Sequence, residues 1–300
     1  MPITALGFLA VFSIGCLVTL KRPFVGILLY FFVFYLHPPG KYWGTFIPEL
    51  RWTLIVALLT LISTFINEKD KKAWLTFKES KLLIIFFLYT VIQYLWVLNS
   101  SFHTIYTILL FKLIILYFLI VTVVNTRKRL IVSIIANLIG CAYIFIQARQ
   151  MHTGGRYENP GLPSIADSNL LAIHLIPIII LGACLFFSKP FKKYNYILLI
   201  PVAFTGNLLL MTGSRGALLA LAVTGLLMIL LAPGKIRKVL TRWSFIVGIA
   251  FSFLAVDLIV ERLESITKVE EGEEIDKSAY SRLVIIEAQW NMFKDNIGLG

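Results

Sequence analysis

The sequence has little charge for its length. Asp, Glu, Lys and Arg together make up 15% of the 300 residues, against about 25% in average soluble proteins. Hydrophobic residues account for 58%, the mean hydropathy is +0.84, and the shortage of charge falls in long apolar runs. This pattern excludes a soluble globular domain and predicts an all-α, polytopic integral membrane protein.

Cysteine, glycine and proline are also scarce. Three Cys, 19 Gly and 11 Pro are too few for a disulfide scaffold or a collagen-like fibre, and the hydrophobic content excludes intrinsic disorder. Cys16, Cys141 and Cys184 lie within apolar runs, so we expect them to be packing residues.

Several chemical motifs are missing as well. The sequence has no P-loop, no glycine-rich dinucleotide motif after a strand, no Cys or His pair at zinc spacing and no repeated carboxylate motif. We therefore expect no metal and no cofactor. A nucleotide-driven pump is disfavoured for the same reason.

The apolar runs are numerous enough for about ten membrane spans. A helix needs about 20 residues to cross a bilayer, and the second and third runs are short for this. The predicted spans are 2–20, 23–37, 52–66, 81–98, 103–124, 130–148, 167–188, 194–212, 215–232 and 241–258. They define a transmembrane domain over residues 1–258.

The basic residues indicate how the spans are oriented. Seventeen Lys and Arg residues lie in every second connection, beginning with Lys21 and Arg22, whereas the intervening connections up to residue 258 hold five. Cytoplasmic loops carry the excess of positive charge, so the N-terminus is predicted to be external. The net charge of +12 thus reflects short cytoplasmic loops, and no nucleic-acid partner is expected.

Residues 259–300 differ in composition from the rest. From Glu261 onward there are nine acidic and five basic residues, which predicts the start of an external loop domain. Apolar residues recur at helical spacing between Tyr280 and Lys294, so we expect an amphipathic helix on the outer face. Because the sequence stops at Gly300 within a loop-like segment, we expect a chain truncated at its C-terminus.

The segment Met211–Ala217 is the first candidate site. Gly213 suits the left-handed position after a helix, and Ser214 can cap the next helix, so two spans are expected to meet in a tight external hairpin. The N-terminus of the predicted span at 215–232 and the guanidinium of Arg215 would then favour an anion, above all a phosphate or diphosphate. The alternative is that Arg215 extends to lipid headgroups.

The loop from Gln147 to Asn169 is the second candidate site. Its glycines and prolines predict fixed turns, and Arg156 is a candidate second anion ligand. Glu158, His152 and Asp167 are candidate general bases, because a hydroxyl acceptor must lose its proton during transfer. The alternative is an ordinary polar loop in which Asp167 caps the helix that follows.

Three further positions carry polar groups. Arg282 with Trp290 on the external helix is either an anion ligand or a headgroup contact. Lys112 falls in the middle of a predicted span, where a charge is costly, so we expect it to face a polar interior. His174 shares a helix face with Asp167 but lies deeper, and we expect it to be a packing histidine.

The same segments carry a resemblance to a known family. The residues concerned are Thr212–Ala220, Gly154–Arg156 leading to Asp167–Ala172, and Arg282 before Trp290 and Asp295–Gly300. They resemble the O-antigen ligase-like proteins, which include polysaccharide ligases and polymerases of bacterial envelopes. The opening, Lys21–Leu29 followed by His37 and Pro38, resembles the subgroup of O-glycosylation ligases associated with the exosortase A system.

This resemblance implies a metal-independent glycosyltransferase of the bacterial inner membrane with its active face outside. It would move a glycan from a polyprenyl diphosphate carrier to an acceptor, which is a lipid, a protein or another glycan. Membrane lipids would surround the enzyme. Arg215 and Arg156 would be catalytic, because they can stabilise the departing diphosphate. The resemblance also implies a histidine in the external loop and further spans, so we expect the general base beyond residue 300. The expected substrate-binding residues are Ser214, Gly216, Arg282, Asp167 and Asn169.

Three other functions stay open. An anion transporter of the bicarbonate type would use Lys112 and the outward-facing helix ends, but the sequence shows no convincing internal repeat of the kind typical of transporters. A polysaccharide polymerase of the same family would share the chemistry and differ in its acceptor. A non-catalytic envelope scaffold would leave the hairpin at Arg215 unexplained.

Overall fold

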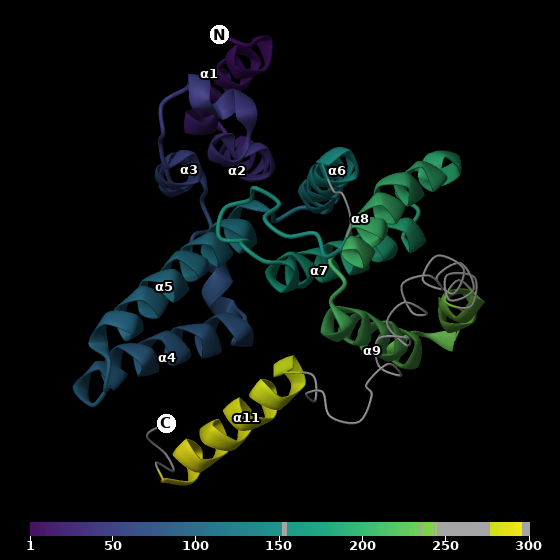
Figure 1. Ribbon diagram of the computed structural model, residues 1–300. Coiled ribbons are helices and arrows are strands. Elements are labelled where there is room, and N and C mark those ends of the chain that lie inside the picture. The colour runs from purple at the N-terminus through teal and green to yellow at the C-terminus, as the bar shows by residue number, and fades with distance from the viewer. Residues whose placement is uncertain (152–154, 235, 243, 245–276, 296–300) are drawn as a thin grey trace. The chain divides into compact units, whose positions relative to one another are not determined.

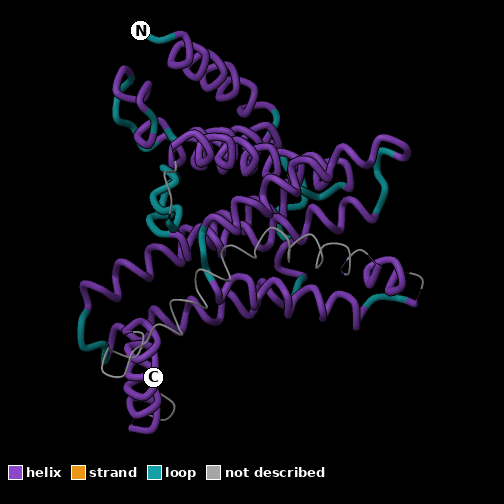
Figure 2. The backbone as a smooth tube through the Cα atoms, turned by 45° about the vertical axis from the view of Figure 1, so that its right-hand side comes forward, coloured by secondary structure: helices purple, strands orange, loops and turns teal. Residues whose placement is uncertain are grey.

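The computed structural model describes residues 1–151, 155–234, 236–242, 244 and 277–295, and this part of the chain contains helices and loops but no strand (Figure 1). The α-helices are α1 (Ile3–Lys21), α2 (Pro23–Leu36), α3 (Trp52–Asn67), α4 (Lys78–Ile92), α5 (Ser100–Val123), α6 (Arg127–Met151), α7 (Ser168–Phe187), α8 (Leu199–Met211), α9 (Arg215–Leu231) and α11 (Lys277–Asp295). Short 3₁₀ helices lie in the connections, at Pro38–Gly40, Tyr42–Phe46, Ala73–Thr76, Gln93–Leu95 and Lys192–Leu198. Figure 2 shows how short most of the connections are. The predicted all-α class is thus confirmed for the described residues.

The chain divides into two compact units. The first holds Met1–Val91 and Leu98–Met228, and the second holds Ile92–Val97 and Ile229–Gly300. The predicted span at 241–258, except for three residues at its start, and the predicted domain boundary at 258 fall outside the described residues.

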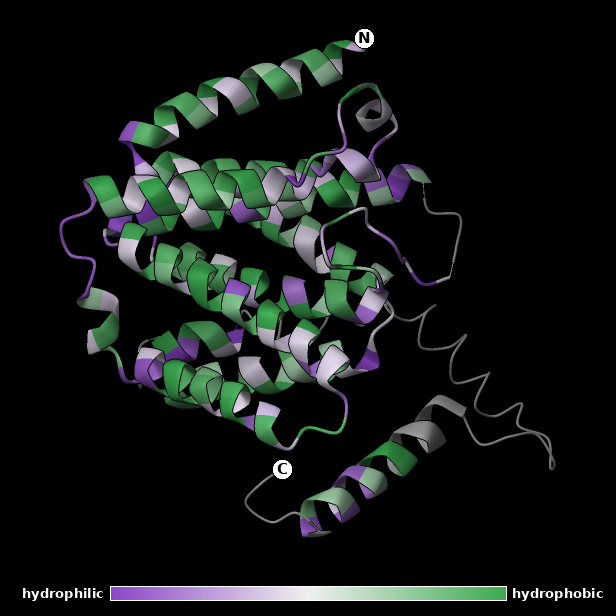
Figure 3. Ribbon diagram, turned by 90° about the vertical axis from the view of Figure 1, so that its left-hand side faces the viewer, coloured by the Kyte–Doolittle hydropathy of each residue, from purple (hydrophilic) through white to green (hydrophobic). Residues whose placement is uncertain are grey.

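Six of the described helices are long and apolar enough to cross a membrane, as a multi-pass membrane protein requires. They are α1, α2 extended to Gly40, α5, α6, α7, and α8 extended back to Lys192. Two more, α3 and α9, are apolar but have only 16 and 17 residues. Figure 3 shows apolar residues along the helices and hydrophilic ones gathered in the connections. The ten spans expected from the sequence are therefore not all confirmed.

The run predicted as a span at 81–98 forms a shorter helix. Helix α4 ends at Ile92, a 3₁₀ turn follows, and α5 starts at Ser100. The side chain of Asn99 caps α5 by accepting the backbone N–H of Phe102 at 3.2 Å. A capping side chain thus sets the start of α5, which a hydropathy average does not detect.

Helix α2 lies at the centre of the first unit and packs against α1, α3, α5 and α6. Its buried side chains enter three apolar clusters, in which Leu29 and Val33 pack with α1 and α3, Ile27 packs with α5, and Tyr35 packs with α6, α7 and α8. Helices α6, α7 and α8 also pack against one another. Helix α2 therefore packs between the N-terminal helices α1 and α3 and the group formed by α6, α7 and α8.

Two glycines allow α2 to pack closely. A side chain at Gly26 would overlap Thr60 of α3, and a side chain at Gly140 of α6 would overlap the ring of Tyr35. Small residues let helix backbones approach closely in a membrane, where van der Waals packing drives helix association. The Tyr35 hydroxyl then lies 3.0 Å from Nε2 of His174, which confirms His174 as a packing histidine.

Three connections meet at one end of the first unit, which we call the site end: residues 37–51, 155–167 and 212–214. Gly40 and Gly161 are so close that a side chain on Gly40 would overlap the Gly161 backbone. The backbone N–H of Tyr157 donates to the carbonyl of Met211 at 2.9 Å. These are the connections that the sequence predicts to lie on one side of the membrane.

Connections predicted to lie on the other side of the membrane also meet one another. Asn67 near the end of α3 donates to the carbonyl of Leu20 at the end of α1, at 2.9 Å. Arg129, near the start of α6, forms an ion pair with Glu68 at 3.2 Å. These contacts agree with the predicted alternation of the connections, whereas the assignment of inside and outside stays a prediction.

Lys112 does not lie where the sequence predicts. Its side chain is exposed on α5 among the described residues, so the expected polar interior around it is wrong for this part of the chain. A lysine on a span can run its methylenes along apolar surface and carry its ammonium toward the headgroups. This flexibility removes the need for a buried polar partner.

Helix α11 in the second unit confirms the helix predicted at 280–294. Its described side chains, from Val284 to Lys294, are all exposed, and Trp290 stacks on Phe293. The side chain of Arg282 lies outside the described part of the chain. The placement of this helix on the outer face stays a prediction.

Replacing Gly140 should test the close packing of α2 on α6. We expect Gly140→Ala to cost about 1–3 kcal/mol, because the added methyl overlaps the Tyr35 ring and overpacking carries a cost of this size. The measurement is thermal unfolding of the purified protein in detergent. The matched control is Gly206→Ala in α8, where an added methyl meets no described atom within 4 Å. Equal melting temperatures for the two variants would contradict this account of the interface.

Candidate functional site

The turn between α8 and α9 has the geometry that the sequence predicts. Gly213 has a φ of 58°, which is the left-handed conformation that glycine adopts at low cost. Ser214 directly precedes α9, and its carbonyl accepts the N–H of Leu218 at 3.2 Å. The Thr212 hydroxyl donates to the carbonyl of Leu209 at 2.6 Å. The two helices therefore meet in a tight hairpin at the site end.

The loop at 155–167 is attached to this hairpin. Nε of Arg156 donates to the carbonyl of Thr212 at 3.2 Å, next to the backbone contact between Tyr157 and Met211. These carbonyls belong to the last residue of α8 and to the residue after it, so they have no helical N–H partner further along the chain. Arg156 thus satisfies an acceptor that the helix end leaves open.

Asn169, in the first turn of α7, connects the loop to the start of α9. Its side-chain oxygen accepts hydrogen bonds from Nη2 of Arg156 at 3.1 Å and from the Ser214 hydroxyl at 3.0 Å. We call Arg156, Asn169, Thr212 and Ser214 the Asn169 junction. The Ser214 hydroxyl was predicted to cap α9, but it donates to Asn169 instead, because the neighbouring N-terminus of α7 brings that amide within reach. Three of the predicted site residues therefore lie in direct contact.

Asp167 caps α7. Its Oδ1 accepts the backbone N–H groups of Asn169 at 2.7 Å and of Leu170 at 3.0 Å. The predicted alternative, a capping aspartate, is confirmed. A carboxylate at this position also interacts favourably with the helix dipole, so Asp167 holds the end of α7 that carries Asn169.

Arg215 and Gly216 open α9 and are both exposed. The guanidinium of Arg215 makes no hydrogen bond or ion pair with the residues that the structure describes. A side chain added at Gly216 would meet no described atom within 4 Å. This stretch of α9 is therefore open for a ligand to approach the backbone, within the part of the chain that is described.

The electrostatics of the site end favour an anion. The starts of α7 and α9 are joined through Asn169 and Ser214, so two helix N-termini, each with a partial positive charge, lie side by side. Arg215 begins α9, and the guanidinium of Arg156 in the preceding loop donates to Asn169 at the start of α7. The Asp167 carboxylate offsets only part of this charge. Helix N-termini combined with arginine are suited to phosphate and diphosphate groups.

Lys41 also lies at the site end, although it is not among the site residues predicted from the sequence. Its ammonium donates to the Gln147 side chain and lies 5.6 Å from the centre of the Tyr143 ring. Burial lowers the pKa of Lys41 to about 8, which still leaves it largely protonated at pH 7. A lone lysine directly after the Pro38–Gly40 turn was the available signal in the sequence.

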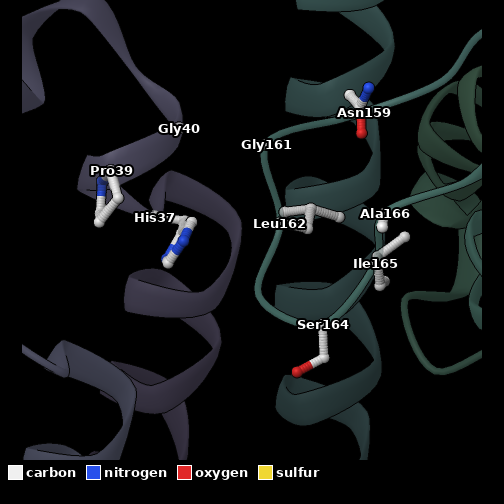
Figure 4. Close-up of a pocket in the computed structure, with 9 residues that line it drawn as sticks. All are labelled: His37, Pro39, Gly40, Asn159, Gly161, Leu162, Ser164, Ile165 and Ala166. Carbon is white, nitrogen blue, oxygen red and sulfur yellow. The ribbon is translucent and has the colours of Figure 1, made fainter.

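A pocket of about 290 Å³ opens at the same end between the segment after α2 and the 155–167 loop (Figure 4). The residues that line it are His37, Pro39, Gly40, Asn159, Gly161, Leu162, Ser164, Ile165 and Ala166. In the sequence, His37 stands out only as part of a family resemblance, and no local pattern predicts the pocket. Contacts between segments 120 residues apart cannot be read from spacing.

The remaining candidates do not join the Asn169 junction in the described part of the chain. Glu158 is exposed on the loop, His152 lies outside the described residues, and so does the side chain of Arg282. No group of three or more His, Cys, Asp or Glu side chains that could hold a metal ion occurs within the described residues.

Comparison with known families divides the chain into two parts. Residues 3–189 match the model of a family described as a family of unknown function, DUF5935. Residues 198–300 match the model described as O-antigen ligase, which supports the resemblance to the O-antigen ligase-like family. No curated protein and no solved structure matches the chain. Since the first match covers more than half of its length, the chain belongs to the DUF5935 family, and the match to the O-antigen ligase model begins just before α8.

Proposed function

We propose that this protein is an envelope glycosyltransferase of the O-antigen ligase type. It transfers a glycan from a polyprenyl diphosphate carrier to an acceptor hydroxyl or amide on the external face of the inner membrane. The observation that carries the proposal is the Asn169 junction, which joins two helix N-termini beside two arginines. The match of residues 198–300 to the O-antigen ligase model supports it independently.

Glycan transfer requires that the negative charge on the departing diphosphate be stabilised. When the bond between the sugar and the diphosphate breaks, its electron pair stays on the diphosphate oxygen. Donors that are fixed in advance stabilise this charge without reorganising during the reaction. Arg215 at the first position of α9 supplies a full charge there, and the exposed backbone at Gly216 lets a phosphate approach the N–H groups of the helix.

Arg156 is held in a fixed orientation for the same task. Two of its N–H groups bind Thr212 and Asn169, and the others are free to bind a phosphate oxygen, since the side chain is exposed. Ser214 and Asn169 keep the two helix starts together, and Asp167 keeps α7 capped. Arg282 is a further cation that would bind the substrate in this proposal. The polyprenyl chain of the donor would lie among the membrane lipids.

The acceptor must lose a proton as it attacks the sugar. Glu158, His152 and Asp167 are candidate bases from this chain, and Asp167 already uses one oxygen in the helix cap. The proposal needs no nucleotide and assigns no metal, because arginine and helix N-termini supply the positive charge.

A polymerase of the same family is the second candidate, since it uses the same donor and differs only in taking a growing glycan as acceptor. A transporter receives less support, because Lys112 is exposed on α5 rather than facing a path between the described helices. Membership of the exosortase-associated subgroup, carried by Lys21–Leu29 and His37, stays a prediction.

Arg215 provides the first test. We expect Arg215→Ala to abolish transfer in a folded, inserted protein, and Arg215→Lys to remain poor because an ammonium cannot make the planar bidentate contact. The measurement is release of polyprenyl diphosphate from lipid-linked glycan in reconstituted membranes. Arg149→Ala is the matched control, since Arg149 is also an exposed arginine at the end of α6 that meets the site end. Full transfer by Arg215→Ala would rule out the site.

A double-mutant cycle tests the Asn169 junction. Asn169→Ala and Ser214→Ala should each slow transfer, because each lets the two helix starts move apart. Residues in one hydrogen-bond network give non-additive effects, so the double variant should be little slower than Asn169→Ala alone. Losses of activity that multiply across the cycle would show that the two residues act separately, and the junction would then not position the site.

A further inference from the structure

The pocket at the site end shares its loop with the Asn169 junction. Its outer wall runs from Asn159 to Ala166, three residues after Arg156 and directly before Asp167. Its inner wall is the turn that ends α2, from His37 to Gly40 (Figure 4). Both ends of the loop are fastened, by Arg156 on one side and by the capped helix α7 on the other. Whatever occupies the pocket therefore lies beside the proposed diphosphate site.

The loop that forms the outer wall has a defined conformation. Asn159, Gly161 and Ser164 have φ angles of 51°, 67° and 60°, and the N–H of Ile165 donates to the carbonyl of Leu162 at 3.3 Å. Non-glycine residues rarely adopt positive φ angles. Contact between Gly161 and Gly40 holds the loop against the end of α2. The pocket is thus shaped by backbone geometry.

The lining combines apolar walls with a few polar groups. Pro39, Leu162 and Ile165 supply apolar surface, whereas Asn159 and Ser164 supply an amide and a hydroxyl. Ligand sites for small molecules typically have this composition. A sugar ring matches it, because its C–H groups pack on apolar surface while its hydroxyls need hydrogen-bond partners. At about 290 Å³ the pocket lies at the lower limit of ligand pockets, about 300–1,000 Å³, which suits one sugar residue.

His37 contributes a buried polar atom without a partner. Its Nδ1 is buried and has no hydrogen-bond partner among the described residues. Buried polar atoms without partners are uncommon, since leaving one unpaired carries the full cost of removing it from water. Because the imidazole lines the pocket, a ligand hydroxyl there can pair with the ring as donor or acceptor, whichever tautomer the ring adopts.

We propose that this pocket binds one sugar residue of the glycan substrate and that His37 hydrogen-bonds a hydroxyl of that residue. The inference rests on the proposed glycosyltransferase function and adds a glycan subsite beside its diphosphate site. This sugar residue belongs either to the donor glycan, next to the diphosphate, or to an acceptor glycan. Both present the same ring and hydroxyl chemistry to the pocket.

Kinetics with lipid-linked glycan test the role of His37. We expect His37→Ala to raise KM about three- to tenfold, the worth of one hydrogen bond, with kcat unchanged. His37→Asn should restore most of the loss, because its amide can place a polar atom near the position of Nδ1. Thr45→Ala, a polar change in the same segment outside the pocket lining, should have no effect. A change confined to kcat, or no rescue by Asn, would overturn the assignment.

Protection of an introduced cysteine tests the pocket without relying on turnover. Ser164→Cys, in a chain with Cys16, Cys141 and Cys184 replaced by alanine, should react with a membrane-impermeant maleimide, because Ser164 is exposed. Three probes are compared: polyprenyl diphosphate-linked glycan, bare polyprenyl diphosphate and the free glycan. Slower labelling with the lipid-linked glycan but not with the bare lipid supports the subsite for the donor. Protection by free glycan supports it for an acceptor.

The outcomes separate the two proposals. Equal protection by bare polyprenyl diphosphate, or no protection by any probe, would overturn the sugar subsite even if transfer proceeds. Sugar-dependent protection in a protein that transfers no glycan would keep the subsite and overturn the transferase.

Discussion

The candidate site depends on one acceptor atom, the side-chain oxygen of Asn169. It binds Arg156 and Ser214 at 3.1 and 3.0 Å, and it thereby holds together a loop, the start of α7 and the start of α9. Each of these segments brings positive charge, either as a guanidinium or as a helix N-terminus. Without this shared acceptor the like charges would favour separation. The cap at Asp167 supports the same arrangement, since it fixes the turn from which Asn169 projects.

The helix packing beneath the site serves this arrangement. Helix α2 packs closely on α6 because Gly140 leaves space for Tyr35, and the same helix ends in the His37–Gly40 turn that reaches the 155–167 loop. In a membrane, close contact between helices depends on such small residues. A position deep in the bundle thus affects the loops at its end, through the rigid helix between them.

Local sequence patterns predicted the local features well. The left-handed Gly213, the cap at Asp167, the hairpin before Arg215 and a helix at 280–294 were all expected, and the structure has them. Each depends on residues within one or two turns, where backbone sterics and capping act. Span predictions were less accurate. The run at 81–98 is interrupted by a 3₁₀ turn, and Lys112 is exposed rather than enclosed, because a hydropathy average records neither capping nor the direction of a side chain.

Composition and periodicity were enough to indicate the class of protein, the apolar helices, the alternation of basic loops and the candidate arginines, because both act over short stretches of chain. Which of these residues meet depends on the tertiary structure. The contact of Asn169 with Ser214 and the pocket between His37 and the 155–167 loop join segments that are 45 or more residues apart. Such contacts depend on how the helices pack and where their ends lie. The positions of the helices are set by side-chain packing across several helices together, which no single stretch of sequence records.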